Sequence, residues 1–309
     1  MKTTKENIHI IGIDHGYGNI KTANCCFGTG VLASDREPAF RNDLLVWNSR
    51  YYIISTGHKE FAANKMLDDD YYVLTLAAIA RELNISHIST ADVFIAAGLP
   101  LTWVSEQKDE FRKYLLQNEY VDFTFRDKEY HVHIVGADVF AQGFAAVIGS
   151  IKDFTGVNML CDIGNGTMNI MFVTDKKPDP RRCFTEKYGT HQCMLQVQEN
   201  VMRIHHTPVL EETVNRILRF GTAEIAPEYL ETITDSARDY AEQIFRRLRE
   251  HGYDPKMMKL HIVGGGGCII KNFAEYDKNR VTINEDICAT AKGYERMSER
   301  YMQSKGGRR

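Results

Sequence analysis

The spacing of hydrophobic residues changes several times along the first half of the chain. Apolar or alternating runs at Ile8–Ile13, Ile20–Phe27 and Leu44–Ile54 predict strands. Tyr71–Asn84 then repeats its apolar residues with helical spacing. A strand is expected at Asp92–Gly98, before the breaker Gly98-Leu99-Pro100. The elements expected next are a helix at Ser105–Glu119, a hairpin of Val121–Phe125 with Tyr130–Val135, and an Ala-rich helix at Val139–Ile151.

The second half begins again with strands and continues mainly as helices. Val157–Cys161 and Met168–Val173 predict two strands, and Lys259–Val263 predicts a third. Helical spacing is found in the following four segments: Gln192–His205, Glu211–Phe220, Thr234–His251 and about 286–302. An alternation of strands and helices on this scale predicts an α/β protein.

One short pattern occurs twice, once in each half of the chain. Asp14–Asn19 reads D-x-G-x-G-N, and Asp162–Thr167 reads D-x-G-x-G-T. Each copy lies between two strand-like runs, so each predicts a hairpin whose tip carries one carboxylate and two glycines. The copies are separated by about half the chain length, which predicts two structurally similar halves.

The composition of these tips favours a phosphate ligand. Glycines in a tight turn expose several backbone N–H groups, and such a concavity binds anions. A carboxylate would repel a phosphate unless Mg²⁺ lies between them, so Asp14 and Asp162 predict a nucleotide–Mg²⁺ site. Lys21 lies just beyond the first tip, within reach of a β-phosphate. The residues expected around the phosphates are Gly16, Tyr17, Gly18, Asn19, Gly164, Asn165, Gly166 and Thr167.

Four consecutive glycines, Gly264, Gly265, Gly266 and Gly267, follow the strand at Lys259–Val263. Four bare glycines suggest that side chains are excluded because a flat ligand approaches the backbone closely. We interpret the turn as the place where an adenine or ribose lies.

Three other interpretations of these residues are weaker. A dinucleotide fingerprint must open a helix, whereas Asn19–Cys26 reads as strand. An aspartic protease dyad needs hydroxyl residues where His15 and Ile163 stand. A zinc site could be drawn from residues whose spacing matches no compact metal pattern: Cys183, His191, Cys193, His205 and His206.

Composition adds limits on partners and location. The chain has 309 residues and a net charge of −3, so no general attraction to nucleic acid or to an anionic membrane follows. No apolar run is long enough for a membrane helix, and residues 1–7 lack a signal-peptide core. A cytoplasmic protein with reduced cysteines, no direct DNA binding and no membrane contact is therefore expected.

Together these motifs resemble the nucleotide-binding core of the actin, hexokinase and heat-shock-chaperone ATPase superfamily. Ile11–Lys21 resembles the first phosphate motif of the superfamily, and Cys161–Thr167 resembles its second phosphate motif. Ile262–Gly267 resembles its adenosine motif. The resemblance implies an α/β actin-like ATPase fold, in which two ribonuclease H-like lobes with mixed sheets flanked by helices enclose a nucleotide cleft. It implies a first lobe at 1–152 completed by the helix at about 286–302, a second lobe at 153–285, and a flexible tail at 303–309.

Within that superfamily the chain resembles the bacterial plasmid-segregation actins of the ParM/StbA type. The resemblance rests on the form of the first motif, on Gly98-Leu99-Pro100-Leu101 and on the compact length. It implies an ATPase that binds ATP or ADP with Mg²⁺ and polymerises with itself. It also implies that the filament moves plasmid DNA through a DNA-bound adaptor protein of the ParR type. The choice between ATP and GTP stays open.

The resemblance also implies separate roles for the site residues. Asp14 would hold the metal and phosphates, Asp162 would polarise the attacking water and contact the metal, and Gln142 would orient that water. Glu212 and Arg216 would contact the base and ribose. The second motif departs from the family pattern at the following three positions: Asn165, Met168 and Asn169.

Two further functions are compatible with the same fold. A small-molecule kinase would need a base for its substrate, and Asp138 and Glu186 are the candidates. A chaperone ATPase would need a peptide-binding domain, for which the sequence leaves no room after the ATPase core.

Overall fold

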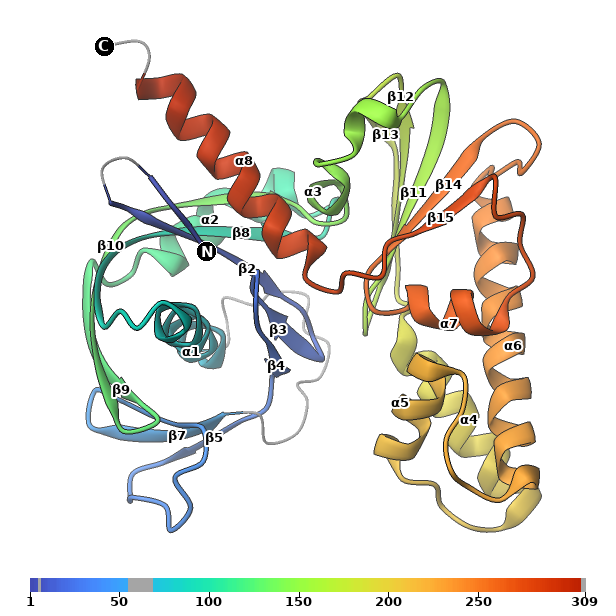
Figure 1. Cartoon of the computed structure of the whole chain (residues 1–309), viewed down its shortest axis with the longest axis horizontal. Coiled ribbons are helices and arrows are strands. Elements are labelled where there is room, and N and C mark those ends of the chain that lie inside the picture. The colour runs from blue at the N-terminus through green and yellow to red at the C-terminus, as the bar shows by residue number, and fades with distance from the viewer. Residues whose placement is uncertain (5–6, 55–68, 307–309) are drawn as a thin grey trace. The chain divides into compact units, whose positions relative to one another are not determined.

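The computed structural model describes residues 1–4, 7–54 and 69–306. Contacts between residues divide the chain into two compact units (Figure 1). Unit 1 consists of Met1–Gly149 and Cys288–Arg309, and unit 2 consists of Ser150–Ile287. Unit 2 is therefore inserted into the sequence of unit 1.

Unit 1 is built on one mixed sheet with the strand order β4-β3-β2-β8-β10-β9-β6-β7-β5, and β1 pairs with β2. The neighbours β2, β8 and β10 are parallel, and the other pairs are antiparallel. Its strands are β1 (Lys2–Thr3), β2 (His9–His15), β3 (Asn19–Lys21), β4 (Cys26–Gly28), β5 (Val31–Ser34), β6 (Leu44–Trp47), β7 (Arg50–Ile54), β8 (Thr90–Leu99), β9 (Tyr120–Phe125) and β10 (Lys128–Ala141). Its helices are α1 (Asp70–Ile85), α2 (Val104–Leu115), α3 (Phe144–Val147) and α8 (Ala289–Gly306).

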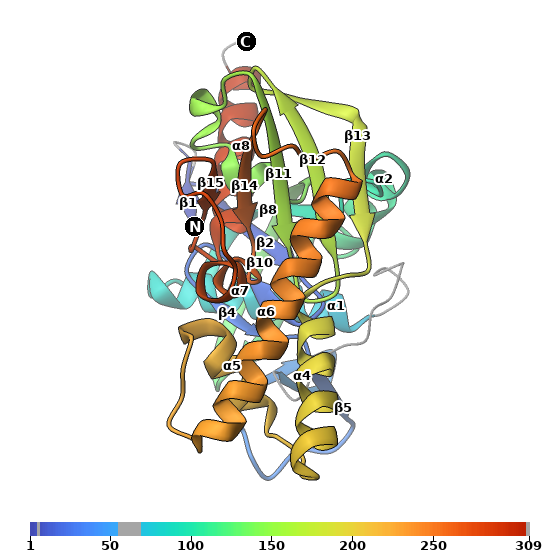
Figure 2. The ribbon, with the colours of Figure 1, turned by 90° about the vertical axis from the view of Figure 1, so that its right-hand side faces the viewer.

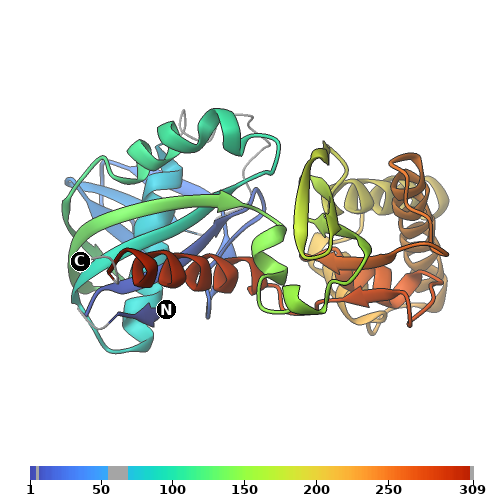
Figure 3. The ribbon, with the colours of Figure 1, turned by 90° about the horizontal axis from the view of Figure 1, so that it is seen from above.

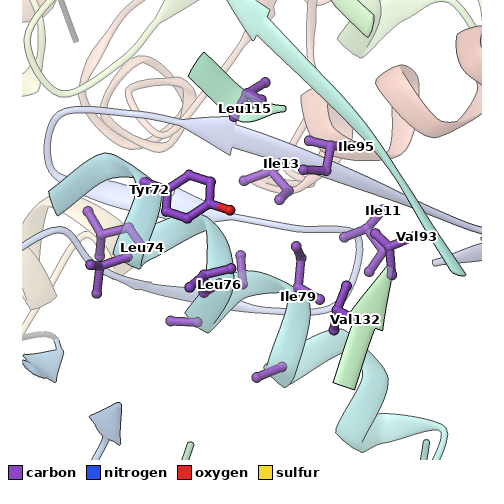
Figure 4. Close-up of a cluster of buried hydrophobic side chains, with 14 of the residues drawn as sticks. Ile11, Ile13, Tyr72, Leu74, Leu76, Ile79, Val93, Ile95, Leu115 and Val132 are labelled. Atoms are coloured by element: carbon purple, nitrogen blue, oxygen red, sulfur yellow. The ribbon is translucent and has the colours of Figure 1, made fainter. Parts of the chain in front are cut away.

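Helices cover both faces of this sheet, so its central strands bury apolar residues on both sides. Alternate residues of a strand point to opposite faces. Ile11 and Ile13 of β2 therefore pack in the core around α1, with side chains such as Leu76 (Figure 4). Ile10 faces the other way and packs with Tyr294 of α8, which lies along the sheet (Figure 3).

Unit 2 has a smaller mixed sheet with the strand order β13-β12-β11-β14-β15, in which β11, β14 and β15 are parallel. Helix α6 crosses one face of this sheet (Figure 2). The strands are β11 (Val157–Ile163), β12 (Met168–Thr174), β13 (Lys177–Glu186), β14 (Lys259–Val263) and β15 (Val281–Ile283). The helices are α4 (Thr190–His205), α5 (Glu211–Phe220), α6 (Pro227–Glu250) and α7 (Gly267–Phe273), with a short 3-10 helix η2 (Ile151–Asp153).

Tyr240 of α6 buries a hydroxyl group in the core of unit 2. Its side chain is fully buried and stacks on Tyr188, and its hydroxyl makes no hydrogen bond within the described ranges. An unpaired buried hydroxyl is unfavourable, so we expect Tyr240→Phe to raise the free energy of unfolding by about 1 kcal/mol. Urea denaturation measures this change. Tyr240→Ala is the control and should cost about 3–5 kcal/mol; a similar loss in Tyr240→Phe would contradict the prediction.

Most elements predicted from the sequence are confirmed. The predicted strand–tip–strand hairpins are formed by β2 with β3 and by β11 with β12. Two helices differ at their ends: the one expected to end at Glu119 ends at Leu115, and the one expected to begin at Thr234 begins at Pro227. The last helix runs to Gly306, so residues 303–306 of the expected flexible tail are helical, while 307–309 lie outside the described residues.

The helix predicted at Val139–Ile151 is wrong. Strand β10 continues to Ala141, only Phe144–Val147 is α-helical, and Ile151 begins the 3-10 helix η2. The strand persists because residues 131–141 pair along the whole length of β8, with Ala141 opposite Leu99. Pairing with a distant strand outweighs the helical preference of alanine in this segment. Gly143, with a φ of 77°, then turns the chain before α3.

The seven cysteines all lie in the described ranges and form no disulfide bond. Each helix in the described ranges is too short or too polar to span a lipid bilayer.

Candidate functional site

In unit 1, the candidate residues lie at the carboxyl ends of three parallel strands. Asp14 is near the end of β2, and Gln142 follows β10 directly. Strand β8 lies between β2 and β10, and the Gln142 N–H donates to the Leu99 carbonyl at 2.9 Å. Because carboxyl ends of neighbouring parallel strands share one edge, the topology itself brings Asp14 and Gln142 together.

The Asp14 carboxylate has two side-chain partners. The Gln142 amide donates from Nε2 to Asp14 Oδ1 at 3.1 Å, and Lys21 Nζ lies 3.7 Å from Asp14 Oδ2. Asp14 is only 8% exposed, so this pair of charges is held largely away from bulk water. The bond to Asp14 also fixes the orientation of the Gln142 amide, because a carboxylate oxygen accepts from NH₂ and not from a carbonyl. The Gln142 Oε1 has no partner among the described residues and is left as an acceptor.

The first hairpin tip is a tight turn formed mainly by backbone. The Gly16 N–H donates to the Asp14 carbonyl at 3.0 Å, and a Cβ at Gly16 would lie 2.6 Å from the Asn19 carbonyl oxygen. The Tyr17 side chain is buried in the unit, and burial raises the pKa of its hydroxyl. Tyr17 therefore presents its backbone and not its ring at the tip. Thr29 supports the turn by donating its hydroxyl to the Tyr17 carbonyl at 2.5 Å.

In unit 2, Asp162 lies beside the glycine turn. Strands β11 and β14 are parallel, with Asp162 opposite Val263. The turn Gly264–Gly267 follows β14 at the same edge of the sheet. Asp162 is 9% exposed, and its Oδ1 is 2.5 Å from the position that a Cβ on Gly264 would take. The carboxylate and the turn are thus direct neighbours.

The steric surroundings differ among the glycines of this turn. At Gly264, with a φ of 85°, a Cβ would also lie 2.6 Å from the Ile163 carbonyl oxygen. At Gly266 a Cβ would lie 2.2 Å from the Ile163 side chain. At Gly265 a Cβ would meet no described atom within 4 Å. Close packing on the second hairpin therefore explains Gly264 and Gly266, and the space that a ligand could use is at Gly265.

The second hairpin tip has oriented backbone amides. The carbonyl oxygens of Ile163, Gly164 and Asn165 accept from Gly266, Thr190 and His191 respectively, each at 2.9 Å. The N–H groups of Asn165 and Gly166 donate to no acceptor in the part of the chain that the structure describes. Since C=O and N–H of one trans peptide point in opposite directions, these two N–H groups point away from α4. Two adjacent outward N–H groups form a concavity that binds anions.

Glu212 and Arg216 are not brought to these residues by any described contact. Both side chains are exposed on α5 and make no hydrogen bond or ion pair within the described ranges. Arg216 lines a surface hollow with the following residues: Phe220, Thr222, Ala223 and Glu224. Helix α5 is linked toward the glycine turn indirectly through α7, where Asn272 donates to the Leu218 and Arg219 carbonyls of α5. Their contact with a base or ribose stays a prediction.

The two carboxylates proposed as kinase bases are engaged in ion pairs. Asp138 lies 3.3 Å from Lys108, and Glu186 lies 2.6 Å from Arg247 and 2.5 Å from His251. Each carboxylate thus already has side-chain partners within its own unit. These ion pairs leave neither carboxylate without a partner that a substrate would have to displace.

Thiols near the second hairpin stay protonated. Burial raises the pKa of Cys193 to about 12, and burial also raises the pKa of Cys161 and Cys268. A protonated thiol is neither a good nucleophile nor a metal ligand. In the part of the chain that the structure describes, no three His, Cys, Asp or Glu residues are grouped as metal ligands. The donors that fit an ion here are single carboxylates, which suit Mg²⁺ bound mainly by water and phosphate.

Several residues that support the site were not singled out in the sequence. Gly189 and Gln192 begin α4 against the second hairpin, and Glu295 of α8 accepts from the Gly12 N–H of β2 at 3.2 Å. A capping pattern, in which Gln follows the N-cap by three residues, marks Gly189 and Gln192 in the sequence. No sequence pattern around Glu295 or Thr29 indicates that these residues support the site.

Comparisons with known proteins agree with this architecture. Residues 12–144 match the family model of the N-terminal domain of actin-like proteins. No curated protein sequence matches the chain. Three solved structures illustrate the likeness in fold. The archaeal actin homologue Ta0583 in complex with ADP is 20% identical, with 94% of this chain and 99% of that chain covered and a TM-score of 0.72. Bacillus thuringiensis ParM with ATP is 14% identical, with 96% and 99% of the two chains covered and a TM-score of 0.71. The Alp12 filament is 16% identical, with 96% and 99% of the two chains covered and a TM-score of 0.68.

These likenesses extend over nearly the whole chain at low sequence identity, so they establish its architecture. The fold class expected from the sequence, with mixed sheets flanked by helices, is confirmed. The chain has the ParM-type actin-like fold, and its residues 12–144 match the N-terminal domain model of the actin-like proteins.

Proposed function

We propose that this chain is an actin-like ATPase that binds Mg²⁺-ATP and polymerises into nucleotide-dependent filaments. The observation that carries the proposal is the Asp14 carboxylate at the first hairpin tip, held by Gln142 at 3.1 Å and by Lys21 at 3.7 Å. A carboxylate, an amide that can orient a water molecule and a cation for phosphate are the parts that phosphoryl-transfer ATPases need.

Each residue of the unit 1 group has a separate role. Lys21 neutralises phosphate charge, and Asp14 holds waters of the metal. Gln142 donates its NH₂ to Asp14, which leaves its Oε1 to accept a hydrogen bond from the attacking water. The fixed amide therefore orients that water without a search over rotamers.

The unit 2 group contributes a second carboxylate and an anion-binding turn. Asp162 polarises the attacking water, and the outward N–H groups of Asn165 and Gly166 bind phosphate oxygens. The open space at Gly265 accommodates the adenosine part. Asp14 and Asp162 are the residues that would hold Mg²⁺, and the ion would supply positive charge for the phosphate.

The descriptions of two structurally similar proteins support filament formation. One of them is described as a filament, Alp12, and another is a ParM with ATP. We extend this to a role in moving plasmid or other mobile DNA in the cytoplasm through a DNA-bound adaptor of the ParR type. The kinase alternative loses support because its two candidate bases are ion-paired.

Nucleotide-dependent assembly is the test of this function. We expect the pure protein at tens of micromolar to sediment and scatter light with Mg²⁺-ATP, and to remain in the supernatant without nucleotide. Electron microscopy of the same samples identifies filaments. Absence of assembly with ATP and with GTP would sink the filament proposal. A sharp rise in ADP release with one small substrate would favour the kinase instead.

A further inference from the structure

The start of helix α4 binds the second hairpin through its first backbone N–H groups. Thr190 donates to the Gly164 carbonyl and His191 donates to the Asn165 carbonyl, both at 2.9 Å. The first N–H groups of a helix have no partner inside the helix, so they are available for such bonds. Here they hold two consecutive peptide groups of the hairpin tip.

Gly189, the residue before α4, makes this approach sterically possible. A Cβ at this position would lie 2.2 Å from the Asn165 carbonyl oxygen and 2.7 Å from that of Gly164. The φ of Gly189 is −97°, which any residue can adopt. Glycine is therefore required by the closeness of the hairpin and not by the backbone conformation.

Gln192 fixes Gly189 in this place. Its side-chain Oε1 accepts from the Gly189 N–H at 2.8 Å, and its own N–H donates to the Gly189 carbonyl at 3.2 Å. The bond from the Gly189 N–H to the Gln192 side chain is one half of a capping box, and the Gly189 carbonyl takes the place of the missing N-cap side chain; together the two bonds restrain the residue before the helix and its first turn. The side chain of Gln192 thus determines where the N–H groups of Thr190 and His191 lie.

These bonds have a consequence for the unpaired amides of the tip. The peptide whose carbonyl binds Thr190 carries the Asn165 N–H, and the peptide whose carbonyl binds His191 carries the Gly166 N–H. A planar trans peptide that is held by its oxygen is also fixed in the direction of its N–H. The orientation of both phosphate-binding N–H groups is therefore set from α4.

We propose that Gln192, together with Gly189, is a positioning residue for nucleotide phosphate, acting through the backbone of Gly164 and Asn165. The proposal rests on the nucleotide-binding function proposed above. It also explains how Asn can stand at position 165, where the related motifs carry Gly. The Asn165 side chain is exposed, and only its backbone takes part in the bonds to α4.

The test compares three single substitutions in the full chain. Gln192→Leu removes the acceptor for the Gly189 N–H at nearly constant size, and Gln192→Glu retains an acceptor oxygen. Gln196→Leu is the matched control, because Gln196 lies one turn further along α4 and its side chain makes no hydrogen bond among the described residues. Binding of Mg²⁺-ATP is measured by calorimetry, and amide hydrogen exchange at Thr190 and His191 is measured without nucleotide.

We expect Gln192→Leu to weaken ATP binding about tenfold, which is the effect of losing one hydrogen bond that orders the site. Exchange at Thr190 and His191 should accelerate in the same variant. Gln192→Glu should restore both values, and Gln196→Leu should match the parent chain in both. A general loss of helix stability would instead affect Gln192→Leu and Gln196→Leu alike.

The two measurements separate failure of this proposal from failure of the proposed function. Unchanged exchange in Gln192→Leu would show that Gln192 does not hold the hairpin. Faster exchange with unchanged ATP affinity would show that the contact does not position phosphate. If the parent chain binds neither ATP nor GTP, the proposed function fails and the phosphate role fails with it, while the exchange data still decide whether α4 holds the hairpin.

Discussion

Asp162→Ala is expected to slow ATP hydrolysis by about 10²–10³-fold, while Mg²⁺-ATP still binds. Asp162 stands at the end of β11 beside the glycine turn, and only its carboxylate is removed. The backbone N–H groups of Asn165 and Gly166 remain to bind phosphate. The measurement is single-turnover hydrolysis alongside ATP affinity.

Asp138→Asn serves as the control for this experiment. Asp138 is a partly buried carboxylate of unit 1 that accepts from the Val139 N–H at 2.9 Å, a bond that asparagine can keep. Hydrolysis should be unchanged in this variant. A normal rate of hydrolysis in Asp162→Ala would show that Asp162 does not polarise the attacking water. A fall in the hydrolysis rate that only follows a fall in ATP affinity would show that Asp162 acts in binding.

Alanine substitutions at two neighbouring glycines of the 264–267 turn should differ in their effects: one should lower stability and the other should weaken ATP binding. Gly264→Ala places a Cβ against the Ile163 carbonyl oxygen at a φ of 85°, so we expect a loss of about 3 kcal/mol in the free energy of unfolding. Gly265→Ala points a methyl group into open space and should change stability by less than about 0.5 kcal/mol. The same methyl group should weaken ATP binding at least about tenfold, because it occupies the space proposed for adenosine.

Urea denaturation and ATP binding on both variants check this pair of expectations. Full ATP affinity in Gly265→Ala would mean that adenosine does not lie against the turn. Normal stability in Gly264→Ala would contradict the close packing of the turn on the second hairpin.

The hairpins could be predicted because their signal is local. Each carries its carboxylate, its glycines and both flanking strands within about twenty residues, and turn chemistry together with strand spacing determines such a unit. The proximity of Asp14 and Gln142 was expected only from the family resemblance. Its physical cause is the pairing of β2 and β10 with β8, which joins residues far apart in the chain.

The predictions that were wrong or incomplete concern residues whose structure depends on contacts with distant parts of the chain. Val139–Ala141 stand at the start of a segment predicted as helix but form strand because β8 offers a complete row of backbone partners. The glycines at 264 and 266 suggested a ligand, whereas a Cβ there would meet Asp162 and Ile163 at Gly264, and Ile163 at Gly266. Gln192 carries a visible capping pattern, but the sequence does not say that the capped helix binds Gly164.

The insertion of unit 2 into unit 1 also affects the order in which the two units can fold during synthesis on the ribosome. Helix α8 covers Ile10 on β2, and Glu295 accepts from the Gly12 N–H. Unit 2 is continuous in sequence and has its own core, so it can fold while the chain is still being made. Strand β2, which carries Asp14, keeps one apolar face uncovered until residues 289–306 have emerged. Unit 2 can therefore acquire its core while unit 1 still lacks its last helix, and the sheet that carries Asp14 is complete only after α8 has docked.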